Sequence, residues 1–359
     1  MTSKVLNICG LLICLLVIVQ NVLAETEATS CGAIFWENVS KGESEKRTAF
    51  IKCLKDAEQG DPTAQHYVAE SYKYGYGVPK NYNEAIRWSK ESAIQGEEIS
   101  FCQLANLYFD GDGISHDYAN ALIWYKKASD NGSVFATKTI GDMYFEGLGV
   151  IRSSFEAIRW YKIAADASDI VFSIQAQFAL GKVYEINKDY KESIHWYVKA
   201  ASNINNPSAE AQLKVGDMYN IGHGVPQSRA EAMKWYLTSY NNRGSAEASY
   251  KIGELWYEGN GVKKNYTNAT NWFRNAALMD DVYSQVKLAS CYLDGHGVKK
   301  DSIQAYVWFT LAAEKDKFYQ KKCDQLEKIM KAPDYAKAKQ LLVEVRGKIR
   351  QSNAPLISF

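Results

Sequence analysis

Proline is scarce in this chain, with 6 among 359 residues, and neither sign of charge is in excess: 42 Lys and Arg stand against 41 Asp and Glu, a formal net charge of +1. The low proline content excludes a collagen-like chain. The charge balance gives no electrostatic reason to expect a nucleic-acid partner. Because 47% of the residues are hydrophobic, the chain is not disordered and can form a core.

Motifs that bind metals or carry catalysis are missing as well. No C-x-x-C or H-x-x-x-H spacing is present, so we predict no metal site. The histidines have no serine or cysteine at a spacing typical of a nucleophile and its base; they are His66, His116, His195, His223 and His296. We therefore expect no cofactor and no enzymatic activity.

The one long hydrophobic run lies at the N-terminus. Lys4 is the only charged residue before Glu25, and residues 8–19 are apolar apart from Gly10. This order predicts a secretory signal peptide at residues 1–24, cleaved after Ala24. A membrane anchor is the alternative, but the run is shorter than the roughly 20 residues that span a bilayer. We expect a chain in the periplasm, in the cell envelope or outside the cell, with no membrane span in its mature part.

Export allows disulfides, and five cysteines remain after the signal peptide. Cys31 with Cys53, and Cys291 with Cys323, are the plausible short-loop pairs. An odd number leaves at least one thiol free or paired with another molecule. Cys102, inside a predicted helix, is expected to be a buried thiol.

Tryptophan recurs at a nearly constant spacing of 36 to 39 residues: Trp88, Trp124, Trp160, Trp196, Trp235, Trp272 and Trp308. Seven residues before each stands a side chain that can cap a helix N-terminus: Asn81, Asp117, Ser153, Asp189, Ser228, Asn265 and Asp301. Alanine, or once serine, follows each of these by four residues. The i, i+4, i+7 pattern predicts the buried face of the second helix of a repeated unit.

A second series marks the end of a first helix in each unit: Tyr72, Tyr108, Tyr144, Tyr184, Tyr219, Trp256 and Tyr292. Glycine or alanine stands three residues before each, which indicates close contact with the partner helix. A G-x-G turn follows in six units, and its first glycine can end the helix in the left-handed conformation. The turn lacks the third glycine of a dinucleotide loop. His223 and His296, at its middle position, are expected to be exposed.

These motifs closely resemble the Sel-one-like repeat family, a variant of the tetratricopeptide helical hairpin. The resemblance implies an all-α fold: an αα-hairpin solenoid, wound as a right-handed superhelix, with seven units at residues 61–313. Residues 46–60 then form a preceding half repeat, and residues 314–351 resemble the terminal helices that cap such arrays. Residues 25–45 are a lead-in, and residues 352–359 are a tail.

Unit four departs from the pattern. Tyr184 is followed by Asp189 after only five residues, so the G-x-G turn is missing, while the preceding connection is four residues longer. In one interpretation the sequence has drifted, and Ile170 and Phe172 merely extend a helix. In the other, the solenoid bends there, and these two residues form an exposed apolar ridge that binds a partner.

A row of lysines is predicted along the C-terminal half of the array. Lys214, Lys251 and Lys287 lie five residues before the end of successive first helices. In related tetratricopeptide arrays this helix lines the inner surface. Asp217 and Glu254 follow two of the lysines by three residues and would partly neutralise them. The row is either a solvated, self-paired face or a groove for an extended acidic peptide.

Stacked hairpins leave an extended binding surface, so we expect a non-catalytic scaffold that binds a protein or peptide and is itself a monomer. The resemblance to exported bacterial members adds host-cell interaction by a pathogen, in entry or trafficking. Two alternatives stay open. Cysteine-rich relatives bind penicillin or peptidoglycan fragments, although they carry cysteines in every repeat. Other relatives are endoplasmic-reticulum adaptors in protein quality control, which four N-x-S/T sequons would allow.

Overall fold

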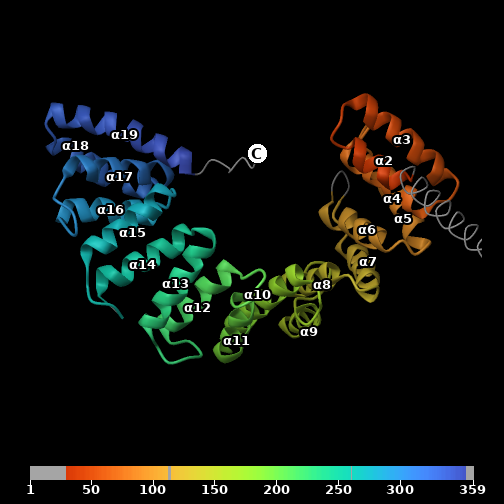
Figure 1. Cartoon of the computed structure of the whole chain (residues 1–359), viewed down its shortest axis with the longest axis horizontal. Coiled ribbons are helices and arrows are strands. Elements are labelled where there is room, and N and C mark those ends of the chain that lie inside the picture. The colour runs from red at the N-terminus through yellow and green to blue at the C-terminus, as the bar shows by residue number, and fades with distance from the viewer. Residues whose placement is uncertain (1–29, 112–114, 260, 353–359) are drawn as a thin grey trace, which may run out of the picture. The chain divides into compact units, whose positions relative to one another are not determined.

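The protein is all-helical in the part of the chain that the structure, a computed structural model, describes: residues 30–111, 115–259 and 261–352 (Figure 1). The expected signal peptide and nearly all of the expected tail lie outside these residues. The helices up to Ala167 form one compact unit, and those from Ser168 form a second. No described helix has the length and hydropathy needed to cross a bilayer. The all-α prediction is confirmed.

The first compact unit begins with a short and a long helix that precede the repeats, α2 (Cys31–Asn38) and α3 (Glu43–Glu58). Three helical hairpins follow: α4 (Pro62–Tyr74) with α5 (Tyr82–Ile94), α6 (Glu98–Asp110) with α7 (Tyr118–Asp130), and α8 (Val134–Glu146) with α9 (Ser154–Ala165).

The second compact unit holds four hairpins and the C-terminal helices. The hairpins are α10 (Ile170–Ile186) with α11 (Tyr190–Ala201), α12 (Ala209–Ile221) with α13 (Arg229–Arg243), α14 (Ala246–Glu258) with α15 (Tyr266–Leu278), and α16 (Val282–Asp294) with α17 (Ser302–Lys315). The chain ends in a 3-10 turn, η1 (Lys317–Tyr319), and in α18 (Gln320–Ile329) and α19 (Ala332–Ser352).

Local sequence explains where the repeat helices begin and end. All seven predicted capping side chains accept a hydrogen bond from a backbone N–H in the first turn of the second helix, as Asn265 does from Asn268 N at 3.0 Å. Such a bond satisfies a donor that the helix itself leaves unpaired. Six first helices end at a glycine in the left-handed conformation, for example Gly295 with φ 75°.

The residue after the repeat tryptophan is a large and almost fully buried side chain in five of the seven units. Tyr125, Tyr161, Tyr197, Tyr236 and Phe273 are among the largest side chains in the structure with almost no exposure. Four of the repeat tryptophans are buried, whereas Trp160, Trp235 and Trp272 are only half-buried. The i, i+4, i+7 pattern therefore marks the buried face of this helix, with the tryptophan at the edge of the face in three units.

The glycines inside the first helices make room for these aromatic rings. A Cβ on Gly216 would lie 2.5 Å from the ring of Tyr236, and one on Gly253 would lie 2.7 Å from the ring of Phe273. The predicted close contact at this position is present, and the group that makes it is a ring rather than a neighbouring helix backbone.

Where the turn lies within the described residues, its second glycine contacts the start of a preceding helix. A Cβ on Gly297 would collide with the backbone carbonyl of Tyr266 at the start of α15, and Gly224 stands in the same relation to Tyr190 in α11. His223 and His296, expected to be exposed, are half-buried. The His296 ring stacks on Tyr266 with ring centroids 4.4 Å apart, because the turn lies directly over that helix start.

Unit four differs as its sequence indicates. Helix α10 has 17 residues, and the missing turn is replaced by Asn187 and Lys188, with Lys188 in the left-handed conformation at φ 62°. The division between the two compact units falls at the longer connection before α10, between Ala167 and Ser168.

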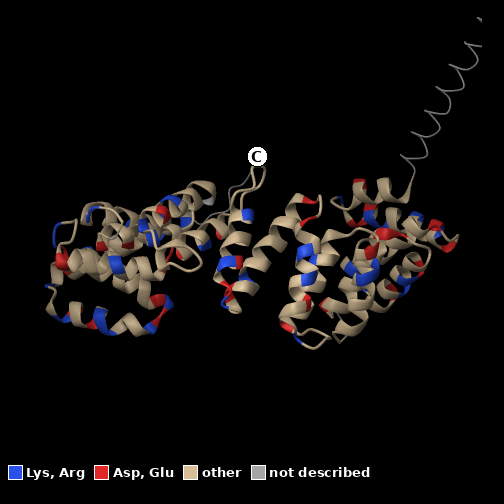
Figure 2. Cartoon of the chain, turned by 90° about the horizontal axis from the view of Figure 1, so that it is seen from below, with Lys and Arg blue, Asp and Glu red and all other residues tan. Residues whose placement is uncertain are grey.

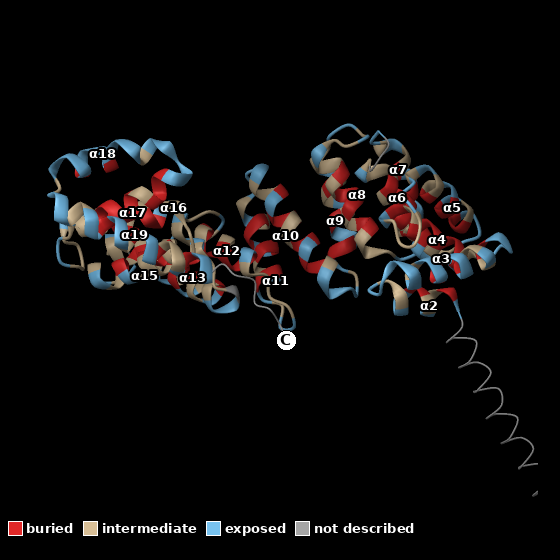
Figure 3. Cartoon of the chain, turned by 90° about the horizontal axis from the view of Figure 1, so that it is seen from above, coloured by how far each residue is buried: buried red, intermediate tan, exposed pale blue. Residues whose placement is uncertain are grey.

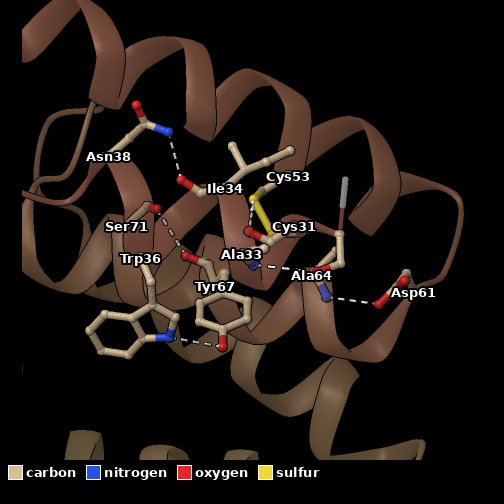
Figure 4. Close-up of a disulfide and its surroundings, with 11 residues drawn as sticks. Cys31, Ala33, Ile34, Trp36, Asn38, Cys53, Asp61, Ala64, Tyr67 and Ser71 are labelled. Atoms are coloured by element: carbon tan, nitrogen blue, oxygen red, sulfur yellow. Dashed lines mark hydrogen bonds between the residues drawn. A yellow bond between two sulfur atoms is a disulfide. The ribbon is translucent and has the colours of Figure 1, made fainter. Parts of the chain in front are cut away.

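The lead-in contains a helix that the sequence analysis did not predict. Helix α2 is joined to α3 by a disulfide between Cys31 and Cys53, whose Cα atoms are 5.0 Å apart (Figure 4). Phe35 on α2 is buried against Tyr67 of α4, with ring centroids 4.9 Å apart. Trp36 is 66% exposed, and its Nε1 donates to the Tyr67 hydroxyl at 3.2 Å.

The second predicted disulfide is wrong: Cys291 and Cys323 are both free and buried. Cys323 on α18 packs against α17, where the Thr310 hydroxyl lies 3.8 Å from its sulfur. Burial raises the pKa of the Cys291 thiol on α16, and the Thr270 hydroxyl of α15 opposes this shift. The two thiols therefore belong to different helix contacts, which a short sequence separation does not show. Cys102 is free and partly buried, and burial raises the pKa of its thiol.

Candidate interaction surface

The predicted lysine row is a ladder of ion pairs between successive first helices. Lys251 Nζ lies 2.9 Å from Asp217 Oδ1 on the preceding first helix, and Lys287 Nζ lies 3.3 Å from Glu254 Oε1 in the same relation. Lys214 pairs with Glu185 of α10 at 3.5 Å. All three cations thus have carboxylate partners. Asp217 and Glu254, expected to pair along their own helix, serve the lysine of the next unit instead.

Tyrosine hydroxyls complete the ladder. The hydroxyl of Tyr236 donates to Asp217 Oδ1 at 2.8 Å, and that of Tyr197 donates to Glu185 Oε2 at 2.7 Å. Burial, and next to it the adjoining carboxylate, raises the pKa of both phenols well above the ordinary value, so each remains a hydrogen-bond donor. Each acid therefore connects its own hairpin to the following one, which is a structural role. Figure 2 shows the two signs of charge interspersed along the helices rather than gathered in one patch.

The predicted apolar ridge is present in altered form at the start of α10. Ile170 is 41% exposed and Val171 is 50% exposed, whereas Phe172 is only half-buried and has contacts within the chain. The helix begins at Ile170 with Asp169 as its cap. The exposed apolar residues are therefore Ile170 and Val171, in the first turn of α10, rather than Ile170 and Phe172.

A pocket of about 450 Å³ opens beside this pair and involves three successive first helices, α10, α12 and α14. Val171, Ile174 and Leu213 supply its apolar side, with Ile174 and Leu213 almost fully buried. Glu210 and Glu247 are exposed members of its lining. The pocket combines an apolar floor with acidic edges, and we call it the α10 pocket.

The serines that line the α10 pocket are already engaged. Ser208 and Ser245 cap α12 and α14 by accepting from backbone N–H groups, and the Ser239 hydroxyl donates to the carbonyl of Ala209 at 2.7 Å. Its lining within the described chain contains no histidine, cysteine or lysine. A serine nucleophile needs a free hydroxyl with a base within hydrogen-bond reach, and the hydroxyls of these three serines are held by the helix caps and by the carbonyl of Ala209. The described residues also contain no cluster of three metal-ligating side chains.

A polar cluster that the sequence pattern does not predict lies inside the first compact unit. His66 on α4 is buried, and its Nδ1 lies 3.0 Å from Gln103 Oε1 of α6. Gln103 Nε2 donates to Glu70 at 2.7 Å, and Ser100 Oγ lies 3.5 Å from His66 Nδ1. Its residues come from helices of adjacent hairpins, so no local pattern could have revealed them.

This cluster should make the first unit sensitive to acid. Burial, opposed by Glu70, Gln103 and Glu97, lowers the pKa of His66 below its ordinary value of 6.5. Below that value the unfolded chain binds a proton that the folded cluster resists, so stability present above pH 6.5 is lost as the pH falls. We expect the free energy of unfolding to decrease from pH 7 to pH 5 and His66→Gln to flatten this decrease, as measured by hydrogen exchange in α4 to α6.

The matched control is His195→Gln, which changes an exposed histidine on α11. It should leave the acid sensitivity of α4 to α6 unchanged. Equal pH profiles for the His66→Gln chain and the unsubstituted chain would contradict the role assigned to His66.

Repeated helical hairpins with glycine-capped first helices, and with an aromatic residue packed on a small residue of the partner helix, define a tetratricopeptide-like αα-hairpin repeat protein. The Sel1 repeat model matches more than half of the chain, at residues 62–97, 102–133, 140–169, 174–205, 209–242, 246–281 and 282–317. The chain belongs to the Sel1 repeat family, the one that its sequence motifs resemble.

Solved structures similar to this chain include a Sel1 repeat protein from Oxalobacter formigenes, with 24% identity, coverage of 86% of this chain and 91% of that chain, and a TM-score of 0.69. That similarity shows the fold. A protective antigen of uropathogenic Escherichia coli with an SLR fold is 26% identical over 87% of this chain and 84% of its own, with a TM-score of 0.36. Yeast Tom70 is 13% identical over 88% of this chain and 61% of its own, with a TM-score of 0.44. No curated protein matches the chain.

Proposed function

We propose that this chain is an exported, non-catalytic scaffold for protein–protein interaction that binds its partner through the α10 pocket. The observation that carries the proposal is the combination of three successive first helices around one pocket with an apolar floor. An exposed apolar pair, Ile170 with Val171, adjoins it. Contiguous exposed apolar surface is typical of interaction sites, and Sel1 repeat arrays supply the extended surface on which such sites occur.

Two features support export. The sequence of residues 1–24 has the order of a signal peptide. The Cys31–Cys53 disulfide would persist in an oxidising compartment and be reduced in most cytosols. For an exported bacterial member of this family, we extend the proposal to host-cell interaction, which rests on the family resemblance alone.

Partner binding is tested by affinity capture with the mature chain as bait, comparing Val171→Asp with Val343→Asp. Both valines are exposed on helices, at 50% and 67%, but only Val171 lines the α10 pocket. The charge that Val171→Asp introduces into the pocket lining should abolish capture of a partner. The unsubstituted chain and Val343→Asp should still capture that partner. A partner captured equally by all three chains would contradict the assignment of the pocket.

Export is tested by expressing the full chain and sequencing the N-terminus of the product outside the cytoplasm. Cleavage after Ala24 predicts a mature chain that begins at Glu25 and contains one disulfide. A chain that stays in the cytoplasm with Met1 intact would contradict export. The proposal that the chain binds a partner protein would not be affected.

A further inference from the structure

The ladder of ion pairs stops at the last hairpin. In the inner units of the second compact unit, an acid on each first helix accepts from the lysine of the next, as Asp217 does from Lys251. The equivalent position on α16 is Ser290, whose hydroxyl donates back to the carbonyl of Val286 at 3.0 Å. The ladder position on α16 therefore carries no carboxylate for a following lysine.

The segment after α17 covers this edge incompletely. Of the residues in α18, only Cys323 and Leu326 are buried, and Figure 3 shows the helix almost entirely exposed. A pocket of about 600 Å³ remains among residues of α16, α17, η1 and α18, and we call it the C-terminal pocket. Val286, Leu293 and Phe309 supply apolar surface there, and Phe318 of η1 lines it while 81% exposed.

Two cations at the C-terminal pocket form no ion pair with the described residues. Lys321 and Lys322 line it from α18, both are exposed, and neither forms an ion pair within the described chain. Asp294 is the one carboxylate in its lining. This contrasts with Lys251 and Lys287, which are already paired. An apolar pocket beside two unpaired ammonium groups is complementary to a ligand that has a large apolar side chain next to carboxylates.

We propose that the C-terminal pocket binds an acidic segment of a partner protein, with an aromatic or large aliphatic side chain placed against Val286, Leu293 and Phe309. The carboxylates flanking that side chain pair with Lys321 and Lys322. The bound segment also covers the exposed ring of Phe318. This inference rests on the proposed function as a scaffold, and it adds a second site with a stated ligand chemistry.

The test uses the mature chain and two fluorescein-labelled peptides, Asp-Glu-Phe-Leu-Glu-Asp and Lys-Lys-Phe-Leu-Lys-Lys, in fluorescence anisotropy titrations. The acidic peptide should bind and the basic one should not, and raising salt from about 50 mM to about 200 mM should weaken binding. The double variant Lys321→Glu/Lys322→Glu should bind the acidic peptide at least about tenfold more weakly, because it replaces attraction by repulsion. Phe318→Ser should also weaken binding of the acidic peptide, because it removes apolar contact with the Phe-Leu pair of that peptide.

The matched control is Lys328→Glu/Lys331→Glu, which changes the net charge equally at exposed positions outside the pocket lining. It should retain binding. Absence of acidic-peptide binding, equal binding of both peptides, or equal losses in the two double variants would overturn the proposal. A second copy of this chain as occupant would appear as dimerisation lost in Lys321→Glu/Lys322→Glu, which also overturns it. Capture of a partner through the α10 pocket is measured in a separate experiment. If that capture succeeds and the peptide does not bind, only the inference about the C-terminal pocket is rejected.

Discussion

Phe273→Ala should lower the free energy of unfolding of the second compact unit by about 3–5 kcal/mol, the range for a large aromatic side chain removed from a core. Phe273 has 0% exposure, and its ring lies against Gly253 on the partner helix and near Tyr250 and Tyr257. Its removal leaves a cavity between α14 and α15. Urea unfolding gives the total loss, and hydrogen exchange should show the largest loss of protection in these two helices.

The adjacent residue is the control for this result. Trp272 is larger than Phe273 but only half-buried, at the edge of the helix face, where it contacts Tyr240 with ring centroids 5.0 Å apart. Trp272→Ala should therefore destabilise the unit less than Phe273→Ala does. A larger loss from Trp272→Ala would mean that the repeat tryptophan, and not the residue after it, is the centre of the hairpin core.

Gly297→Ala should destabilise the last hairpin junction by about 2–5 kcal/mol. Gly297 has φ 70°, a left-handed conformation that costs a residue with a Cβ roughly 1–2 kcal/mol. Its added Cβ would also collide with the backbone carbonyl of Tyr266, which cannot move as a flexible side chain can. Such overpacking adds about 1–3 kcal/mol. The measurement is urea unfolding together with hydrogen exchange at the start of α15.

Gly244→Ala separates the two contributions. Gly244 also has a left-handed conformation, with φ 60°, but a Cβ there would have no atom within 4 Å. Gly244→Ala should lower the free energy of unfolding only by the conformational cost, about 1–2 kcal/mol. If both substitutions had the same effect, the contact between the turn and the preceding hairpin would contribute nothing to stability.

Much of the fold could be predicted because nearly every unit carries capping and turn residues of the same kind at the same spacing. Side chains such as Asn265 bond to the first turn of the helix that they precede, and glycines such as Gly295 end the preceding helix by their backbone freedom. These effects act within a few residues, so a periodic sequence displays them directly. Helix α2 was missed because it is short and lies outside the periodic part, where its disulfide and the burial of Phe35 hold it.

The candidate surface could be predicted only in part. The sequence placed Lys214, Lys251 and Lys287 on one row, and the structure gives each of them a carboxylate on the preceding first helix. Neither the α10 pocket nor the C-terminal pocket is visible in a single segment, because each is assembled from several helices.

The order of residues was sufficient to predict a helical-hairpin array of seven repeats, since caps, turns and amphipathic spacing are local properties. Three-dimensional packing was needed to show that in five units a large side chain after the tryptophan is more deeply buried than the tryptophan itself, and that Cys291 and Cys323 remain free. It was also needed to show which lysines are paired and which, at Lys321 and Lys322, are not. These features depend on which hairpin surfaces meet, and that is a property of contacts between residues distant in sequence.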